Sequence, residues 1–273
     1  MVKRKHPRRQ TSRTPSGEKP QLLIWGRHPA RAALCNPDRR VTACHVTKNA
    51  ANALFADNMR PLGLPIYQTS TRELATRLPA GAIHQGVVLD VDPLPRPTLN
   101  AVLEDLGKDG PLVILDQVTD PHNIGAILRS CAVFGALALV TTNRHAPPET
   151  GTLAKAAAGA LDVVPWIRVG NLAQALDGIR NAGWWVVGLS GDAEAAIGDA
   201  RLHDEGLRPA VVLGAEGKGI RRLVKEKCDI LLRIPMLSEN TVKYDKVIDS
   251  LNVSNAAAVA LYEISRNRAV TQT

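Results

Sequence analysis

Apolar residues in the second half of the chain form short continuous runs separated by longer amphipathic segments. The runs interpreted as strands span residues 112–115, 136–140, 163–168, 184–189, 210–213 and 230–234. The helices expected around them span residues 121–134, 153–160, 172–182, 220–227 and 255–266. Continuous rather than alternating apolar runs are typical of parallel strands covered on both faces. The pattern therefore predicts an α/β domain with an open, mostly parallel six-stranded sheet.

Residues 21–92 show shorter elements, divided by prolines and glycines. The strands expected in this part span residues 22–25, 41–46 and 87–91, and the helices residues 29–34, 50–59 and 71–78. Pro93, Pro95 and Pro97 follow, and prolines so closely spaced favour an extended linker. We therefore expect a small α/β domain over 21–92, a linker over 93–109 that includes a short helix, and a second domain over 110–273.

The first 20 residues differ from both domains in charge. The chain has 34 Lys and Arg against 26 Asp and Glu, a formal net charge of +8, and seven of the cations lie in residues 1–20 beside one acid, Glu18. With almost no apolar residues, this tail is expected to be disordered. A polycation is attracted to the phosphates of nucleic acids through counterion release. A tail that only aids solubility is the alternative.

Composition excludes several classes of protein. Hydrophobic residues make up 45% and charged residues 22%, as in ordinary globular proteins. No run approaches the ~20 apolar residues of a membrane span, and the charged N-terminus lacks the apolar core of a secretory signal. We therefore expect a soluble, cytoplasmic protein with no membrane partner. The four cysteines form no CxxC pair, which favours buried reduced thiols over a metal site or a disulfide framework.

Ligands of open α/β sheets bind beyond the carboxyl ends of the strands, so the loops there are the places to search. The first such loop, from residue 116, leads into a helix for which Asp120 is a good N-cap and Pro121 a good first residue. Arg129 lies off the apolar stripe of this helix, with Gly125 and Ala126 one turn before it. We expect a groove beside its guanidinium. An ordinary helix with a solvated arginine is the alternative.

The second loop, GAEGKG at 214–219, has three glycines in six residues, which permits close approach of a ligand to the backbone. It is neither the GxGxxG fingerprint nor a Walker A loop, since Lys218 is followed by Gly219. A purely structural turn is the alternative. Glu216 in this loop needs a partner if it is buried, and Arg129 is one candidate.

The third loop ends at an alanine-rich helix. Ser250 and Asn252 present hydrogen-bonding groups just before it, and Ser254 is the expected N-cap. Capping alone is the alternative explanation of these residues.

The three loops together resemble the SpoU/TrmH branch of the SPOUT superfamily of RNA 2′-O-methyltransferases. The matching stretches are DPHNIGAILRSCAVFGA (120–136), VVLGAEGKGIRRL (211–223), RIPM (233–236) and SLNVSNAAAVALYE (250–263). GRHPARAAL (26–34) and HQGVVLDV (84–91) are similar to the ribosomal-protein-like RNA-binding domain of that family. The resemblance implies S-adenosylmethionine as methyl donor, a homodimer and a C-terminal trefoil knot. The layout most resembles the large-subunit rRNA guanosine 2′-O-methyltransferases.

The resemblance also assigns residues. The functional positions of the family match Asn123, Arg129, Glu216, Ser250 and Asn252. The positions expected to bind the donor, largely through backbone, are Thr141, Leu213, Gly214, Ile234, Met236 and Leu251. No metal is implied. Residues 237–249 form an insertion where the family usually has a short loop, and we expect it beside the donor.

The expected function is methylation of a ribose 2′-hydroxyl in structured RNA, most specifically a guanosine of 23S rRNA or of a pre-ribosomal particle. Methylation of tRNA and a non-catalytic role in ribosome assembly are the alternatives. A nucleotide-dependent oxidoreductase is a third class, against which the missing fingerprint loop argues. Arg129 either stabilises the developing alkoxide or acts as a base, and stabilisation is favoured because guanidinium groups in proteins stay protonated.

Overall fold

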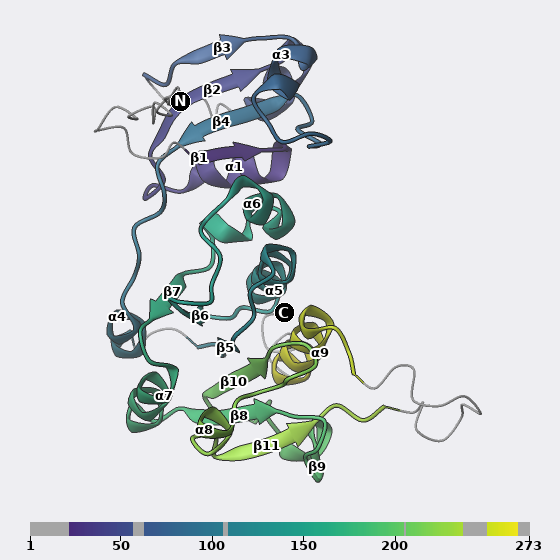
Figure 1. Cartoon of the computed structure of the whole chain (residues 1–273). Coiled ribbons are helices and arrows are strands. Elements are labelled where there is room, and N and C mark those ends of the chain that lie inside the picture. The colour runs from purple at the N-terminus through teal and green to yellow at the C-terminus, as the bar shows by residue number, and fades with distance from the viewer. Residues whose placement is uncertain (1–21, 57–62, 106–108, 205, 237–249, 267–273) are drawn as a thin grey trace, which may run out of the picture.

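Two sheets joined by an extended segment make up the chain, as the computed structural model shows (Figure 1). The structure describes residues 22–56, 63–105, 109–204, 206–236 and 250–266. The expectations for the tail of residues 1–20 and for the insertion 237–249 concern residues that the structure does not describe. The predicted knot is in the same position, because the chain path that would form it includes residues 237–249.

The first sheet has four strands in the order β1-β4-β2-β3. They are β1 (Leu22–Trp25), β2 (Val41–Val46), β3 (Ile66–Gln68) and β4 (Val87–Val91). Strand β3 runs parallel to β2 at the edge, whereas β4 is antiparallel to both its neighbours. The sequence pattern did not predict β3, because a strand of three residues with only Ile66 half-buried is too short to show a periodicity.

Alternate residues of these strands pack on opposite faces of the sheet, as the pleat requires. One face lies under α1 (Arg27–Cys35) and α2 (Lys48–Leu54), whose Ala33 and Leu54 join the core with Leu89. The other lies under α3 (Thr71–Thr76), whose Leu74 packs with Trp25. The first domain is therefore a small three-layer unit.

The second sheet has seven strands in the order β7-β6-β5-β10-β8-β11-β9, and all neighbouring strands are parallel. The strands are β5 (Leu112–Asp116), β6 (Ala138–Thr142), β7 (Trp166–Val169), β8 (Trp185–Leu189), β9 (Ala195–Ala196), β10 (Pro209–Gly214) and β11 (Ile230–Arg233). Six of them lie where the apolar runs predicted. The expectation of six strands is wrong by one, because β9 is a two-residue strand with no apolar run of its own.

Helices cover both faces of this sheet, which explains why its strands are continuously apolar. Val113, Leu115 and Leu213 face the first layer, and Ile114, Val140 and Val212 face the second. The first layer contains α5 (Pro121–Val133), α6 (Gly151–Ala157) and α9 (Val253–Ser265). The second contains α4 (Leu99–Glu104), α7 (Leu172–Asn181) and α8 (Arg222–Lys225). Two 3-10 turns, Ala160–Asp162 and Ile197–Ala200, complete the described elements.

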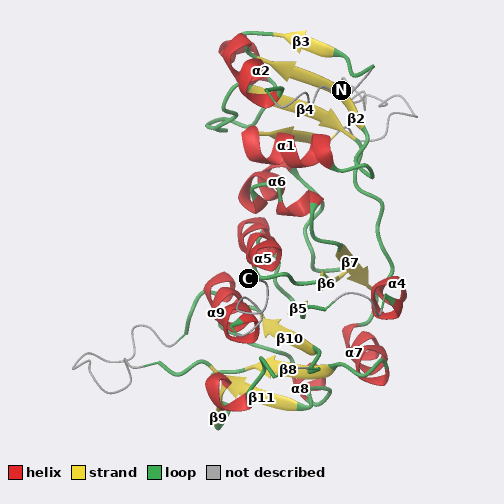
Figure 2. Ribbon diagram, turned by 180° about the vertical axis from the view of Figure 1, so that it is seen from behind, coloured by secondary structure: helices red, strands yellow, loops and turns green. Residues whose placement is uncertain are grey.

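The helices α1, α6, α5 and α9 follow one another down one side of the molecule, in both views (Figures 1 and 2). At the junction between the domains, Gly151 of α6 lies so close to β1 that an added Cβ would be 1.9 Å from the Trp25 ring. Arg39 crosses the same junction, with its Nε 2.7 Å from Asp162 and its Nη1 2.6 Å from Glu149. The two sheets are therefore docked through α6 and its neighbours. None of the helices in the described ranges is long and apolar enough to cross a membrane.

Candidate functional site

The second sheet reverses its winding between β5 and β10, and the crevice at such a point is the usual ligand site of open α/β sheets. The loop after β5 leads directly into α5. Asp120 caps this helix by accepting a hydrogen bond from the His122 amide, and Pro121 occupies its first turn, as predicted. Asn123 is thereby held in the first turn of α5, beside the loop that follows β10.

The glycine loop after β10 folds back on itself. The Gly219 amide donates to the Ala215 carbonyl at 2.8 Å, and Gly217 and Gly219 have φ values of +74° and +63°. A Cβ on Gly214 would lie 2.0 Å from the Gly219 carbonyl carbon, so any side chain at 214 would force the turn open. The tight turn holds Glu216 at its tip.

Asp116 fixes the far end of this loop, and sequence reasoning did not identify it. Its side chain is fully buried at the end of β5, accepts hydrogen bonds from the Arg221 amide and Nε at 2.9 and 2.8 Å, and forms an ion pair with Arg221 Nη2 at 2.7 Å. The signal in the sequence was an acid directly after a continuously apolar strand. This pair ties the chain just after the glycine loop to the neighbouring strand.

The third loop meets α9 two residues earlier than expected. Asn252, not Ser254, is the N-cap, because the Asn252 Oδ1 accepts from the amide of Ser254 at 2.9 Å and also from its hydroxyl. Since Oδ1 is used in this way, the amide nitrogen of Asn252 points away from the helix and is available to donate.

Three side chains from the three loops form one hydrogen-bonded group. Glu216 Oε1 accepts from Asn252 Nδ2 at 2.5 Å and from Asn123 Nδ2 at 3.1 Å, and Asn252 Nδ2 also lies 3.1 Å from Asn123 Oδ1. All three side chains remain accessible from outside the fold. The carboxylate thus orients both amides, and residues 123, 216 and 252, separated by up to 129 positions, meet at one point.

A cavity of about 310 Å³ adjoins this group. Its walls include most of the residues predicted for the donor and the reaction: Leu213, Gly214, Glu216, Ile234, Met236, Ser250 and Leu251. The structure therefore brings together the glycine loop, the segment after β11 and the residues before α9. Its lining combines apolar side chains with a turn of exposed backbone.

Four further polar residues line this cavity: Ser190, which follows a strand at the edge where the donor was expected, and Asp192, Lys218 and Lys225, to which the sequence assigned no role. Lys225 of α8 donates to the Ser190 hydroxyl at 2.9 Å and lies 3.9 Å from Asp192. Ser190 and Asp192 follow β8, so their place at the carboxyl edge was the available signal. A lysine on a short helix carried no such signal.

Arg129 and Thr141 lie apart from this group. Arg129 is exposed on α5, and its side chain makes no hydrogen bond or ion pair with any residue that the structure describes, Glu216 included. The groove expected beside it at Gly125 is filled, since a Cβ there would lie 2.5 Å from the Ala156 Cβ of α6. Thr141 is 2% exposed, and its hydroxyl accepts from the Trp166 indole at 2.9 Å.

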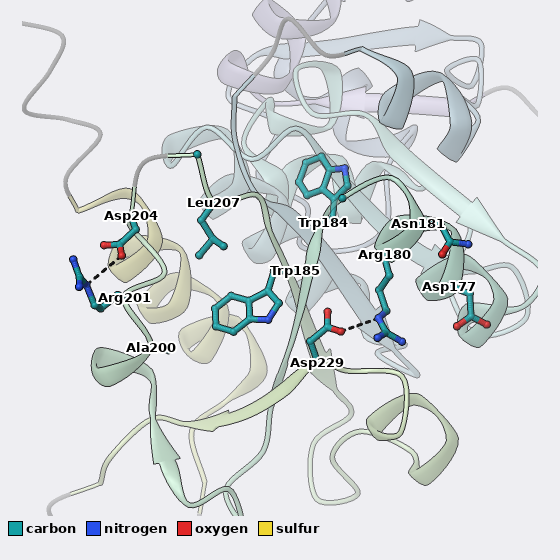
Figure 3. Close-up of a pocket in the computed structure, with 12 residues that line it drawn as sticks. Asp177, Arg180, Asn181, Trp184, Trp185, Ala200, Arg201, Asp204, Leu207 and Asp229 are labelled. Atoms are coloured by element: carbon teal, nitrogen blue, oxygen red, sulfur yellow. Dashed lines mark ion pairs between the residues drawn. The ribbon is translucent and has the colours of Figure 1, made fainter.

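A second and larger cavity, of about 980 Å³, opens at the opposite edge of the sheet, near the starts of β8 and β11 (Figure 3). Its charged side chains are all paired: Arg180 lies 2.8 Å from Asp229 and Arg201 lies 3.2 Å from Asp204 (Figure 3), and Asp177 lies 2.9 Å from Lys227 outside the lining. Ion pairs of this kind leave little unsatisfied charge for a ligand. The amino edge of a parallel sheet is also the less frequent place for one.

No group of three or more His, Cys, Asp or Glu side chains within the described ranges could hold a metal ion. Burial raises the pKa of the Cys44, Cys131 and Cys228 thiols to about 12, so none of these three is a nucleophile at neutral pH. The chemistry available at the site is therefore that of amides, a carboxylate, a hydroxyl and nearby cations.

Comparison with protein families gives two matches. Residues 110–262 match the family described as SpoU rRNA Methylase, and residues 23–97 match the one described as RNA 2′-O ribose methyltransferase substrate binding. The 23S rRNA (guanosine-2′-O-)-methyltransferase RlmB of Photobacterium profundum is 36% identical over 255 residues, which cover 91% of this chain and 98% of that protein. The protein of the same name from Coxiella burnetii is 35% identical over 251 residues, 90% of this chain and 95% of that protein.

Solved structures agree with the fold. The SpoU methyltransferase AviRb from Streptomyces viridochromogenes, solved with AdoMet, superposes with a TM-score of 0.72 over 91% of each chain at 23% identity. An RNA methyltransferase of the TrmH family from Porphyromonas gingivalis gives 0.71 over 90% of each chain at 24% identity. At these identities the superpositions bear on the fold alone.

Proposed function

Because the chain belongs to the SpoU rRNA methylase family, we propose that it transfers a methyl group from S-adenosylmethionine to the ribose 2′-hydroxyl of a guanosine in 23S rRNA. The observation that carries this proposal is the group of Asn123, Glu216 and Asn252, joined by hydrogen bonds beside a cavity at the carboxyl edge of the sheet. The choice of guanosine and of 23S rRNA follows the activity named for the relatives that are 35–36% identical.

The cavity suits S-adenosylmethionine in the chemistry of its lining. Leu213, Ile234, Met236 and Leu251 offer apolar walls for a flat purine, and the turn that follows Gly214 offers backbone polar groups without side chains in the way. These residues would hold the donor. When bound, it supplies a methyl group on a sulfonium, which makes the transfer favourable. We do not assign Thr141 to this site, because its side chain is buried elsewhere.

The chain itself must position the ribose and favour loss of the hydroxyl proton. In this proposal Glu216 holds the amides of Asn123 and Asn252 in one orientation, and the amides and the Ser250 hydroxyl bind the ribose or the amino-acid end of the donor. Such positioning of the reactants lowers the activation free energy by ~7–11 kcal/mol in favourable cases.

Arg129 is proposed to bind the target nucleotide and stabilise the developing alkoxide. It lies six residues beyond Asn123 on α5, about 9 Å along the helix, and its guanidinium is exposed and unpaired within the described part of the chain. A guanidinium stays protonated in proteins, so it is a poor base but can stabilise a developing negative charge. Arg129→Lys should lose most of its methyl transfer, because lysine keeps the charge but lacks the planar fork. Near-normal turnover by this variant would show that the planar guanidinium group is not needed to stabilise the alkoxide.

A homodimer is proposed through α5 and α9. Val133, Val259 and Tyr262 on these helices are 70%, 40% and 58% exposed, and the Tyr262 ring packs edge-on against Phe134. A second copy of the same face would cover this apolar patch and lie beside Arg129. Light scattering checks it: Val259→Glu should shift the mass from two chains to one, and an unchanged dimer would place the interface elsewhere.

We also propose that the C-terminal segment forms the trefoil knot of the family and that the protein acts in the cytoplasm, on 23S rRNA or a precursor particle. The knot is supported by the position of residues 250–252 beside the glycine loop of β10, a strand in the middle of the sheet.

The tail of residues 1–20 is proposed to strengthen RNA binding through its cations. Its deletion should then flatten the salt dependence of RNA affinity and leave donor affinity unchanged.

The decisive experiment is transfer of labelled methyl groups into purified RNA. The purified protein is incubated with labelled S-adenosylmethionine and, separately, with unmodified 23S rRNA and with bulk tRNA, and modified nucleotides are mapped by their resistance to alkaline cleavage. We expect one labelled guanosine in 23S rRNA, and no label with the Asn123→Ala variant. Label in tRNA alone would favour a tRNA methyltransferase. Donor binding without label in either RNA would favour a non-catalytic ribosome-assembly factor.

A further inference from the structure

Two stacked rings lie at the outer edge of the first sheet. His45 on β2 pairs in register with Tyr67 on β3, and the two ring centroids are 5.0 Å apart with an angle of 18° between the planes. Tyr67 is 53% exposed, although only nine residues of the whole chain are Phe, Trp or Tyr. Strand β3 forms the edge of its sheet, at the top of Figure 1.

The two ends of this row of side chains differ: the end at Trp25 is covered, and the end at Tyr67 is exposed. Along this face of the sheet the row runs from Trp25 on β1 through Val88 on β4 to His45 and Tyr67. Helix α3 covers the inner end, where Leu74 and Leu78 pack with Trp25 and Val88. Among the residues that the structure describes, no strand lies beyond β3, so the outer face of the Tyr67 ring is not covered by another ring of the row.

The inner ring of the stack is held by a buried acid. His45 Nε2 donates to Asp90 Oδ2 at 3.0 Å, and Asp90 is 4% exposed. Arg77 Nη2 binds both oxygens of the same carboxylate, at 2.8 and 3.0 Å. The imidazole can therefore not rotate away from Tyr67 without breaking a bond to a buried carboxylate. The arginine offsets the charge of this carboxylate, so the support of the stack is an ion pair rather than an isolated buried acid.

We propose that Tyr67 is a stacking site for an unpaired base of the RNA substrate, with His45 as its fixed support. An aromatic ring that is open on one face and rigid on the other suits the flat face of a base, and sequence-specific contacts of proteins with RNA favour unpaired bases stacked on aromatic rings. This inference rests on the proposed function, because it takes the substrate to be RNA.

The position of the stack makes it a contact distant from the reaction. Strand β3 lies at one end of the molecule and the strands that carry the donor cavity at the other (Figures 1 and 2). A base on Tyr67 is therefore not the base of the methylated nucleotide. It would fix the position of a large folded RNA, so its loss should raise the KM for RNA and leave kcat and donor affinity unchanged.

The alternative is that the two rings only stabilise the edge strand, as cross-strand aromatic pairs do. A series at position 67 separates the two. Tyr67→Phe and Tyr67→Trp keep a flat ring, Tyr67→Leu keeps an apolar side chain without one, and Tyr67→Ala removes both. Ile83→Ala is the matched control, because Ile83 is a 70% exposed apolar residue of the same domain that belongs to no site described above.

The measurements are RNA affinity by filter binding to a 23S rRNA transcript, the KM and kcat of methyl transfer, and the thermal midpoint of each variant. We expect Tyr67→Ala and Tyr67→Leu to weaken affinity at least five-fold and to raise KM alike, with kcat unchanged. The Phe and Trp variants should bind within two-fold of the original chain, as should Ile83→Ala. Base stacking typically supplies an effect of this size.

The proposal would be overturned if RNA affinity among the four variants fell in step with the thermal midpoint, whether or not a ring is present. Equal RNA binding by all four variants would overturn it too. Photo-crosslinking of a 4-thiouridine-substituted transcript gives an independent readout: the peptide that contains Tyr67 should carry the crosslink, and a crosslink confined to other peptides counts against the site. If the original chain transfers methyl groups to 23S rRNA while these results fail, the stacking site alone is wrong.

Discussion

Asn252 has two roles at one position, because its Oδ1 caps α9 while its Nδ2 donates to Glu216. The sequence left open whether the residue is there for capping alone. The structure shows why a capping residue with an amide differs from one with a hydroxyl. Serine caps a helix as well as asparagine does, but it has no second group that reaches the carboxylate.

Asn252→Ser should therefore keep the fold and lose the reaction. We expect the free energy of unfolding to change by less than about 0.5 kcal/mol, since both residues are good N-caps. Methyl transfer should fall about ten- to a hundred-fold, because a hydrogen bond to a charged group contributes roughly 1.5–3 kcal/mol. Kinetics and urea unfolding of the same preparation check both values.

Asn171→Ser is the matched control, since Asn171 caps α7 in the same way, by accepting from the Gln174 amide. It should leave methyl transfer unchanged. Full activity of the Asn252→Ser variant would mean that capping alone explains the residue at 252.

The cysteines give a prediction about reactivity. Burial disfavours the charged thiolate, which raises the pKa of Cys44, Cys131 and Cys228 to about 12, whereas Cys35 is exposed. At pH 8 these three thiols are almost wholly protonated, so a thiol-specific disulfide reagent should modify one cysteine quickly in the native protein and four in denaturant. Cys35→Ser should abolish the fast phase. A fast phase that persists in this variant would show that a buried cysteine becomes exposed.

At the scale of elements, helix packing explains a glycine that the sequence analysis misread. We interpreted Gly125 as leaving a groove beside Arg129, but the missing side chain lets α6 approach α5. A small residue on a helix has these two readings, and only the position of the neighbouring helix separates them. Because α5 also carries Asn123, this contact helps to set where the site lies.

Gly125→Ala should push the two helices apart. The new Cβ would lie 2.5 Å from the Ala156 Cβ and 2.9 Å from the Ala157 amide nitrogen, neither of which can swing aside. Overpacking costs typically ~1–3 kcal/mol, part of which the better helix propensity of alanine offsets by up to ~1 kcal/mol. We expect a lower thermal midpoint together with weaker methyl transfer.

Gly178→Ala provides the comparison, because Gly178 lies within α7 and its added Cβ would meet nothing within 4 Å. This variant should be more stable by about 0.4–1 kcal/mol and fully active. If Gly125→Ala also stabilised the protein, α5 and α6 would be able to move apart without a loss of stability.

Sequence patterns predicted those elements whose own residues determine them. The strand expected over 41–46 has the same bounds as β2, and the continuous apolar runs give six strands of the second sheet. The short strands β3 and β9 were missed because pairing with a neighbour, not periodicity, defines them. In the site, residue identity indicated Glu216, Asn123 and Asn252, but their mutual hydrogen bonds depend on three loops far apart in sequence. Arg129 was one candidate partner of Glu216, but Asn123 and Asn252 take that place. The position of Arg129 on its helix could not predict toward which side chains the glycine loop turns Glu216.

At the scale of the whole molecule, the proline-rich segment predicted a linker between two domains, and the structure shows these domains docked on each other. Arg39 is the centre of this junction: its side chain is fully buried, binds Glu149 and Asp162 of the second domain, and donates to the Asp92 carbonyl at 3.0 Å. Gly151 and Trp25 meet beside it without room for a Cβ. A rigid junction would hold the RNA-binding sheet at a fixed distance from the donor cavity.

Arg39→Met should loosen that junction, because it leaves the carboxylates of Glu149 and Asp162 without their cation. Breaking a buried ion pair costs about 3–5 kcal/mol, so the urea midpoint should fall clearly and small-angle scattering should give a larger radius of gyration. Arg40→Met is the neighbouring control: Arg40 is 79% exposed and lies 3.6 Å from Asp92, and exposed pairs contribute little. If docking positions the RNA, Arg39→Met should also raise the KM for 23S rRNA while donor affinity stays unchanged. An unaltered radius and KM would mean that the apolar contacts around Gly151 hold the domains together without the ion pairs.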